Sequence, residues 1–307
     1  MTASRAHLPN GRHHWQHGPI DIVAEAEGAS DAVAAAHDAA WQRFQSILRE
    51  LVAELPLLRQ PVQVGPNPLR GPIARRMWDA CAPFAPEFVT PMAAVAGSVA
   101  QELIALYQRP GITRAWLNNG GDLALHLAPG ARVRSGVVGD LQSYAFDSER
   151  TGQLAGLFDI SFETPVRGIA TSGWRGRSLS MGIADSVTVL AATAAQADAA
   201  ATIIANAVNA QHPAIVRQPA NQCRDNSDLG ERLVTMDVPR LPADVVQAAL
   251  EAGAATAHVL QQRGLIWAAL MVCQEQARRV EPLCFALESQ VIAGAVTASR
   301  TIEPCPI

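Results

Sequence analysis

Residues 167–210 read RGIATSGWRGRSLSMGIADSVTVLAATAAQADAAATIIANAVNA, and this stretch guides the interpretation of the whole chain. A strand over Gly168–Ser172 ends in a Thr-Ser-Gly turn, and a polar loop rich in glycine follows. A second apolar strand over 186–190 then leads into an alanine-rich helix over 194–209. The stretch therefore predicts strand, loop, strand and helix in immediate succession.

The flanking sequence extends this pattern without strict alternation of strands and helices. Upstream we expect a long helix capped by Ser30, a helix that starts at Thr90-Pro91, and strands over 112–117, 123–127, 132–138 and 158–163. Downstream we expect strands over 233–238, 265–273 and 284–287, a helix over 243–262, and a polar surface loop over 217–235. Consecutive strands favour the α+β class, with mainly antiparallel strands packed against helices.

Composition narrows the classes of function. The chain has 307 residues, 17% of them charged, with a net charge of −4, so no basic stripe is available for nucleic acid. The N-terminus lacks an apolar signal region and no run of eighteen apolar residues occurs, which predicts a cytoplasmic protein with no membrane span. The five cysteines have neither zinc-site nor disulfide spacing, and we expect small buried residues or free thiols.

The first sixteen residues are polar and rich in histidine. We expect a flexible N-terminus over 1–16, followed by one domain over 17–307. His13, His14 and His17 are spaced closely enough to converge on a metal, but a frayed or strand-forming terminus is the favoured interpretation.

The helix over 194–209 carries the candidate metal ligands. Thr193 and Gln196 have the spacing of a capping box, which sets the helix register. Asp198 and Thr202 then lie one turn apart on the same face. A carboxylate and a hydroxyl at this spacing suit Mg²⁺, which prefers oxygen ligands shared with substrate phosphates; alternatively, both residues simply face water.

Two turns are candidate ligand contacts. Asn118, Asn119, Gly120, Gly121 and Asp122 form either a β-hairpin turn or a backbone that a ligand approaches closely, with Asp122 accepting from a ribose or ring N–H. Thr171, Ser172 and Gly173, followed by Arg175 and Arg177, supply hydroxyls, N–H groups and guanidinium groups for a diphosphate, although one arginine is expected to be structural.

Taken together, these motifs resemble the ApbE superfamily, whose best-known members are FAD:protein FMN transferases. The matching segments are LNNGGDL at 117–123, GIATSGWR at 168–175, SVTVLA at 186–191 and ADAAAT at 197–202. Within the superfamily the chain is most similar to an uncharacterised branch, through HGPIDI at 17–22, TPMAAVAGSVA at 90–100, RSLSMGIADSVTV at 177–189 and SDLGERLVT at 227–235. The resemblance implies a two-lobed single domain that binds FAD, with Mg²⁺ held by Asp198 and Thr202.

One segment departs from the transferase pattern. Flavin transferases of this superfamily carry His-Ile-x-Asp-Pro-x-Thr-Gly between the Thr-Ser-Gly turn and the following strand. Here residues 176–185 read GRSLSMGIAD, without His or Pro, and Asp185 is the remaining carboxylate. Asp185 and Ser178 are therefore the candidate catalytic residues of this loop.

Three functions remain open. The first is a Mg²⁺-dependent transferase or hydrolase that acts on FAD, since phosphoryl chemistry depends mainly on positioning and charge neutralisation. The second is an enzyme of another class on the same scaffold, with Ser178, Ser180, Asp140 and Asp185 as candidates. The third is a flavin- or nucleotide-binding module without activity. In each case we expect Asp122, Ser172 and Asp198 to face a common cavity that takes a small nucleotide or flavin.

Overall fold

A computed structural model of the chain describes residues 2–8, 11–138 and 154–282, and the description below is confined to them. The chain forms two compact units. The first comprises residues 1–131, 166–170 and 190–199, and the second comprises 132–165, 171–189 and 200–307. The predicted Asp140 and the strand expected over 284–287 lie outside the described residues.

The first unit is built on antiparallel strands. β1 (Ser4–His7), β2 (His13–His17), β3 (Ile20–Gly28), β4 (Ile112–Asn119) and β5 (Asp122–Leu127) follow one another in the sheet, and β5 then pairs with β8 (Gly168–Ser172). Alternate residues of β3 are buried, as a sheet covered on one face requires. The N-terminal segment thus forms strands, one of the two alternatives left open by its sequence.

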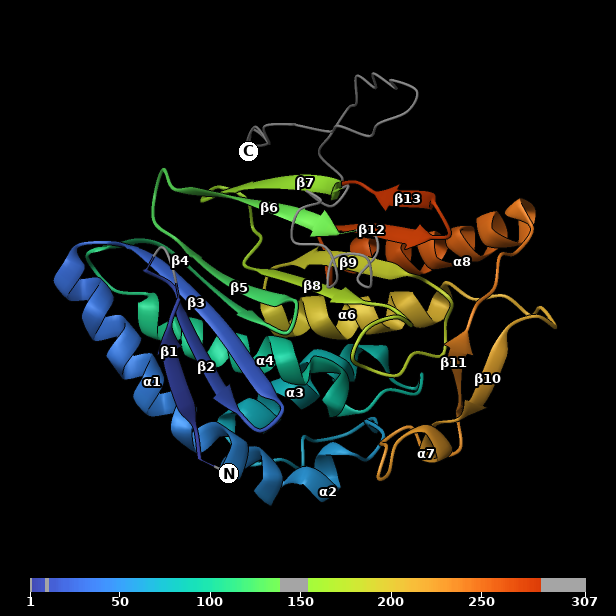
Figure 1. The fold of residues 1–307 in the computed structure, drawn as a ribbon, viewed down its shortest axis with the longest axis horizontal. Helices are drawn as coiled ribbons and strands as arrows, with labels where there is room; N and C mark the ends of the chain where they lie inside the picture. Colours follow the sequence, from blue (N-terminus) through green and yellow to red (C-terminus); the bar gives the residue numbers. More distant parts are fainter. Residues whose placement is uncertain (1, 9–10, 139–153, 283–307) are drawn as a thin grey trace. The chain divides into compact units, whose positions relative to one another are not determined.

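Helices cover this sheet. α1 (Ser30–Ala53) packs against β2 and β3, and α4 (Val95–Ile104) packs against β4 and β5 (Figure 1). The buried residues of α1 recur every three to four positions as one stripe, which consists of Ala36, His37, Ala40, Phe44, Ile47 and Leu51. Shorter helices complete the unit: α2 (Leu55–Leu58), α3 (Pro72–Cys81) and the 3-10 turns η2 (Ala82–Phe84), η3 (Pro91–Ala94) and η4 (Ala105–Tyr107).

The predicted cap of α1 is wrong by one residue. Ser30 is the first helical residue, and Ala29 is the N-cap, with an extended backbone and no side-chain cap. Asp31 supplies a side-chain acceptor within the first turn, since its Oδ1 accepts from Ala32 N–H at 2.9 Å, and the Ala29 N–H donates to the Gly111 carbonyl at 2.8 Å. The helix predicted from Thr90-Pro91 is divided, because Ala94 leaves helical geometry between η3 and α4.

The second unit contains the remaining strands. Its part of the sheet has the order β8, β9 (Ser186–Ala191), β12 (Ala268–Cys273) and β13 (Gln276–Val280), and α8 (Ala243–Gln262) packs against β12 and β13. Two further strand pairs are β6 (Arg132–Val138) with β7 (Leu154–Ser161), and β10 (Val216–Pro219) with β11 (Leu233–Asp237). The surface loop predicted over 217–235 was wrong in part, since β10 and α7 (Ala220–Cys223) occupy its first half.

The predicted order of strand, loop, strand and helix over 167–210 is confirmed. β8 and β9 flank the loop, and α6 (Ala194–Ala207) follows two residues shorter than expected. Gln196 N–H donates to the Thr193 hydroxyl at 3.2 Å, as a capping box requires, but the Gln196 side chain accepts from that hydroxyl and does not reach the cap N–H.

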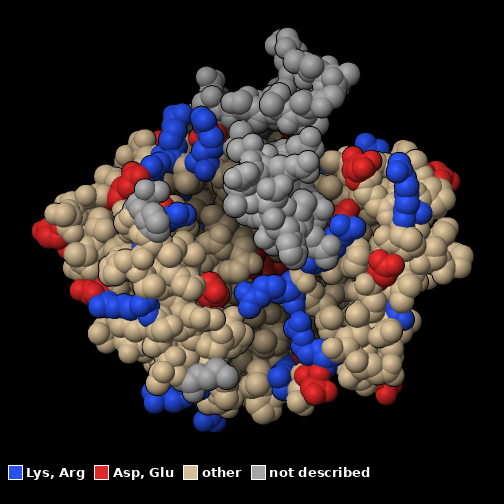
Figure 2. Space-filling view, viewed as in Figure 1, with Lys and Arg blue, Asp and Glu red and all other residues tan. Residues whose placement is uncertain are grey.

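The α+β class is therefore confirmed by strands that pair mainly in antiparallel fashion and by helices segregated from them. Among the described residues no helix is sufficiently long and apolar to span a bilayer. Charged side chains of both signs are spread over the face shown in Figure 2, between uncharged residues that cover most of it.

Candidate functional site

The predicted site residues are distributed over both units. Asn119, Gly120, Gly121, Asp122 and Asp198 belong to the first unit. Thr171, Ser172, Gly173, Arg175, Arg177, Ser178, Asp185 and Thr202 belong to the second. Each group is described below within its own unit.

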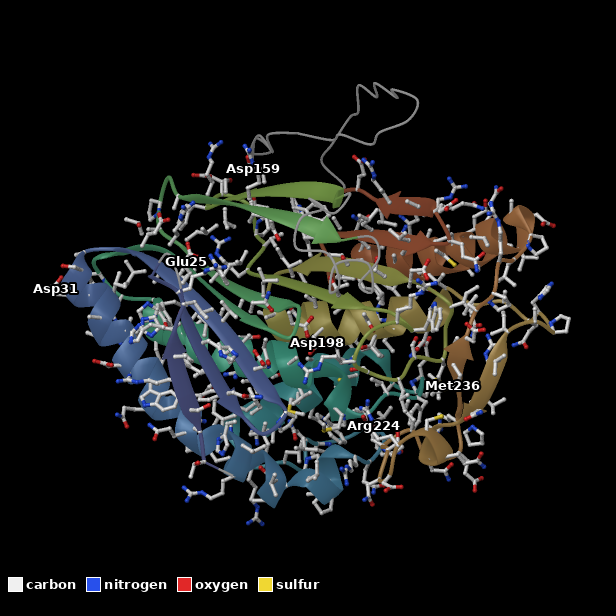
Figure 3. All side chains as sticks on the ribbon, in the orientation of Figure 1. Glu25, Asp31, Asp159, Asp198, Arg224 and Met236 are labelled. Atoms are coloured by element: carbon white, nitrogen blue, oxygen red, sulfur yellow. The ribbon has the colours of Figure 1, made fainter. Side chains whose placement is uncertain are left out.

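A pair of carboxyl groups is the central feature of the first unit. Asp122 begins β5 and Asp198 lies in the second turn of α6, and their side chains are within hydrogen-bonding reach of each other. Asp122 is buried, whereas Asp198 is densely surrounded but keeps part of its surface accessible. Figure 3 labels Asp198, in the interior of the ribbon beside α4. The fold thus holds together two acidic groups far apart in sequence.

The backbone of α4 binds the same carboxyl. Gly97 N–H donates to Asp198 Oδ2 at 2.9 Å, and Ala96 N–H is a second donor. These are the second and third residues of α4, whose cap residue Ala94 offers no side-chain acceptor. The first N–H groups of a helix have no partner within it and carry partial positive charge. Asp198 therefore supplies the acceptor that this helix lacks.

The close approach of α6 to α4 depends on Gly97. A Cβ atom at this position would lie 2.2 Å from the Ala194 carbonyl oxygen and 2.9 Å from the Asp198 Cβ. Both distances are far below ordinary van der Waals contact. The flank of small residues seen in the sequence of this helix is thus used for contact between backbones, and it brings the α4 amides onto Asp198.

The carboxyl pair has a strongly perturbed ionisation. Burial, followed by the neighbouring Asp122 carboxyl, raises the pKa of Asp198 well above its usual range, while the N–H groups of Gly97 and Ala96 act in the opposite direction. Two carboxylates this close repel each other unless a proton or a cation lies between them. The pair is therefore a place for one positive charge.

The donor set of this pair suits a hard cation. Among the described parts of the chain, no three His, Cys, Asp or Glu side chains gather into a metal-binding group, so further ligands must be hydroxyls, carbonyls or water. Mg²⁺ is commonly bound by only one or two carboxylates with waters and phosphates. Thr202 follows Asp198 by one turn of α6 and is half-buried, which is the spacing predicted for a hydroxyl ligand.

The turn before Asp122 is a hairpin turn. Asn119 pairs directly with Asp122, and the two glycines between them have φ values of 64° and 118°. The Asn118 side chain accepts from Gly121 N–H at 2.8 Å, and Asn119 Nδ2 donates to the Ala96 carbonyl at 3.1 Å. A Cβ on Gly121 would meet no atom within 4 Å, so its backbone faces open space. The hairpin is confirmed, and ligand contact at the same turn stays a prediction.

Asp185 is the centre of a polar cluster in the second unit. Its Oδ1 accepts from Trp174 Nε1 at 3.3 Å and lies 3.2 Å from Arg175 Nε. Its Oδ2 accepts from Gln274 N–H at 2.6 Å. Since Asp185 is also buried, these partners give it a structural role, and the catalytic role expected for it stays a prediction.

The same cluster engages the turn after β8. Arg175 lies over the Trp174 ring at 5.0 Å as well as beside Asp185, so this arginine is the structural one of the predicted pair. A Cβ on Gly173 would lie 2.5 Å from the Asp185 carbonyl oxygen, which explains the glycine by packing.

The hydroxyl and basic groups of this segment differ in exposure. Thr171 Oγ1 bonds to Thr188 Oγ1 at 2.9 Å, while Ser172 is half-buried and Arg177 and Ser178 are exposed. Exposed Arg177 is therefore the arginine that remains a candidate for phosphate.

The other predicted reactive residues are placed as follows. Cys81 and Cys273 are buried, and burial raises the pKa of Cys81 above its usual range and that of Cys273 to about 12, so neither is a thiolate nucleophile. Ser180 is buried and its Oγ donates to Asn206 Oδ1 at 3.4 Å. His14 bonds to Asp21 at 3.0 Å, whereas His13 stacks on His37, so the strand points the neighbouring imidazoles to opposite faces.

Sequence reasoning missed the residues that act through their backbone. The Ala96 and Gly97 amides carry no side-chain signal, because any residue but proline presents the same backbone N–H. Trp174 and Gln274 were missed because each is recruited by Asp185 through tertiary contacts.

Comparison with known proteins places the chain in a family. A family model described as AbpE bacteria matches residues 5–279. A UPF0280 protein of Methanopyrus kandleri is 37% identical over 166 residues, which cover 53% of this chain and 61% of the relative. A UPF0280 protein of Methanothermobacter thermautotrophicus is 40% identical over 122 residues, or 39% of this chain and 43% of the relative. The chain thus spans about half the length of the curated relatives it matches.

Solved structures align with nearly the whole chain, but their backbones superpose on it only loosely. The apo crystal structure of the flavinyl transferase ApbE of Pseudomonas stutzeri covers 92% of this chain and 94% of its own, at 13% identity and a TM-score of 0.41. The family match therefore carries the assignment, and it confirms the resemblance to the ApbE superfamily. The chain belongs to the AbpE bacteria family.

Proposed function

We propose that this protein binds a flavin nucleotide, FAD, together with Mg²⁺, and that the cation is held at the Asp122–Asp198 pair. The carboxyl pair is the observation that carries the proposal, because two acidic groups within hydrogen-bonding reach, of which Asp122 is buried and Asp198 is densely surrounded, demand a compensating positive charge. Membership of the AbpE bacteria family and the resemblance to FAD:protein FMN transferases supply the ligand class.

The proposed cation ligands are Asp198 and Thr202, with Asp122 as a second carboxylate. When bound, Mg²⁺ would neutralise charge on a diphosphate. The protein's own contribution is to hold Asp198 in place through the Ala96 and Gly97 amides, so that the carboxylate needs no reorganisation when the cation arrives.

The ligand contacts are proposed for each unit separately. In the first unit, the accessible backbone of Gly120 and Gly121, between buried Asn119 and Asp122, would approach the nucleotide closely. In the second unit, we propose phosphate contacts by Thr171, Ser172, Gly173 and Arg177, with Arg175 held in place by Asp185. The net charge of −4 favours such a small ligand over nucleic acid, and a cytoplasmic location stays a prediction.

Hydrolysis of FAD to FMN and AMP is the activity this arrangement would support. Water would attack one phosphorus of the diphosphate and the bridging P–O bond would break, and Asp185 and Ser178 are the candidates for moving the proton from the water to the leaving phosphate. A second function, binding without turnover, is favoured by the surroundings of Asp185. Both of its oxygens are already engaged by Trp174, Arg175 and Gln274, and the loop carries no imidazole to act as a base.

Thermal unfolding tests the cation site. Wild-type protein freed of metal with EDTA should gain thermal stability on addition of Mg²⁺ and more on addition of Mg²⁺ with FAD, because a ligand that binds only the folded state stabilises it. Asp198→Asn and Asp122→Asn should each lose most of this gain. Asp31→Asn is the matched control, since Asp31 is an exposed acidic residue in the first turn of α1.

The outcomes separate the alternatives. An Asp198→Asn variant that responds to Mg²⁺ as the wild type does would rule out the cation site. Detection of released FMN and AMP by chromatography would establish turnover. Binding of FAD without either product would establish the second function.

A further inference from the structure

Three imidazoles contact one another in series between the N-terminal hairpin and α1, and this series is called the stack below. His7 on β1 lies directly opposite His13 on β2, and their rings meet edge-on, with centroids 4.4 Å apart and an interplanar angle of 62°. The His13 ring stacks on the His37 ring of α1 at 3.9 Å with an interplanar angle of 19°. His37 Nδ1 in turn bonds to the Tyr107 hydroxyl at 2.7 Å. The stack runs from exposed His7 through half-buried His13 to fully buried His37.

The charged groups around the stack are already engaged with one another. Arg5 on β1 pairs with Asp38 on α1 at 3.2 Å, whereas His14 on β2, which pairs with Asp21 at 3.0 Å, points to the opposite face of the strand. Arg109, which follows η4, acts on Tyr107. The groups facing the stack are thus one carboxylate with a partner, a phenol and two arginines. Asp38 acts to raise the pKa of His13 and of His37, but burial and the neighbouring imidazoles outweigh it, and both pKa values are lowered.

We propose that the end of the β1–β2 hairpin that carries His7 and His13 is an acid-sensitive latch, which lies on α1 when the three imidazoles are neutral and lifts away when they take up protons. Face-to-face packing at 3.9 Å suits neutral rings, whereas two imidazolium ions at that distance repel each other. Lifting lets water reach His37, which is the only way for this buried ring to become hydrated as a cation.

The titration properties agree with this geometry. Burial, and then the neighbouring His13, lowers the pKa of His37 to about 4, and burial with His7 and Arg5 lowers the pKa of His13. The closed latch therefore binds fewer protons than the open latch, so acid favours opening. With a pKa of about 4 when closed and about 6.5 when open, His37 alone should raise the open-to-closed ratio about 30-fold at pH 5.

The lifted segment is limited by the neighbouring core. Trp15, two residues after His13, is fully buried and packs against Phe44 and Trp41 with ring centroids 5.8 and 6.2 Å away. β2 from Trp15 onward should therefore stay in the sheet. β1 is already an exposed edge strand, so opening would instead uncover Val23 and Ala24 of β3, which pair with His14 and His13, and with them backbone groups that another chain could pair with.

Hydrogen–deuterium exchange on the full chain tests the latch. Peptides containing residues 4–7 and 13–14 should exchange about 30-fold faster at pH 5 than at pH 8 after correction for the intrinsic pH dependence, while peptides from Ile112–Asn119 should not change. His13→Phe keeps an aromatic ring in the stack and removes the charge, so this variant should lose most of the acceleration at pH 5. His7→Phe takes its place if His13→Phe does not fold. His14→Asn lies outside the stack and should show the same acceleration as the wild type.

Either of two results would overturn the proposal. One is acceleration below about threefold in the wild type at pH 5, since the His37 pKa alone demands ten times more. The other is acceleration that survives unchanged in His13→Phe or His7→Phe. Acceleration that disappears in the Phe variants and persists in His14→Asn supports it.

Discussion

Replacing Gly97 by alanine is the sharpest test of how the Asp122–Asp198 pair is held. The new Cβ would lie 2.2 Å from the Ala194 oxygen, 2.6 Å from the Ala194 carbonyl carbon and 2.9 Å from the Asp198 Cβ. All three atoms belong to the first turns of α6, and two of them are backbone. Ordinary contact is about 3.5 Å, so α4 and α6 must separate by about 1 Å. No side-chain rotation can relieve this clash.

The loss of stability expected for Gly97→Ala follows from two opposing effects. Overpacking in a well-packed interior costs about 1–3 kcal/mol, whereas alanine stabilises a helix by about 1 kcal/mol relative to glycine. The backbone character of the contacts places the clash at the upper end, so we expect a net loss of about 2 kcal/mol. With an unfolding entropy near 2.1 cal/mol/K per residue, this lowers the Tm by about 3 °C.

The assay combines thermal unfolding with Mg²⁺ titration. Separation of the helices lengthens the 2.9 Å bond from Gly97 N–H to Asp198, so the variant should also lose most of its stabilisation by Mg²⁺. Ala96→Gly is the matched control, because it costs about 1 kcal/mol in helix propensity but leaves the N–H donor and adds no atom. A Gly97→Ala protein as stable as the wild type, with an unchanged Mg²⁺ response, would refute the reasoning.

Two further predictions concern the acidic residues. Without metal, in EDTA, the raised pKa of Asp198 means that the folded state keeps a proton that the unfolded state has lost. The free energy of unfolding should therefore fall as the pH rises above about 4. The slope should be up to about 1.4 kcal/mol per pH unit until the pH passes the raised pKa. Urea unfolding at several pH values should show this slope in the wild type and a smaller one in Asp198→Asn, and equal slopes would contradict it. The Asp185→Ala variant should lose about 3 kcal/mol of unfolding free energy, because Arg175, Trp174 and Gln274 N–H are left without their acceptor. Asp185→Asn keeps an acceptor oxygen and should lose about half as much. Chemical denaturation measures both losses, and equal losses would contradict the structural role given to the Asp185 carboxylate.

The elements with strong local signals could be predicted from the sequence. Thr193 and Gln196 marked the start of α6. The Asn-Asn-Gly-Gly-Asp run marked a hairpin turn because glycine adopts positive φ without strain. In each case the residues that determine the structure are neighbours in the chain.

β13 was missed because its hairpin turn lacks such a signal. Gln274 and Glu275 form the turn with φ values of 46° and 67°, where Asn or Gly would be usual. Contacts from distant segments stabilise this geometry: Gln274 N–H donates to Asp185 at 2.6 Å, and its side chain bonds to the Pro239 carbonyl at 2.7 Å and to Leu241 N–H at 2.9 Å. A sequence pattern contains no information on such support.

The candidate site also combines features that the local sequence predicts with features that depend on tertiary contacts. Asp198 was identified from its position on the helix, and Asp122 from its turn, but their direct pairing depends on how β5 and α6 pack. Asp185 looked catalytic because a lone carboxylate stood in an altered loop. Its engagement by Trp174, Arg175 and Gln274 depends on side-chain directions that spacing cannot give.

The division into two units has a consequence for any attempt to dissect the protein. The chain passes from one unit to the other five times, at residues 131/132, 165/166, 170/171, 189/190 and 199/200, and three of these crossings fall inside β8, β9 and α6. No single cut of the polypeptide therefore yields either half as a continuous piece. Melting of one half would break strands and a helix that the other needs, so we expect the whole chain to denature as one cooperative body.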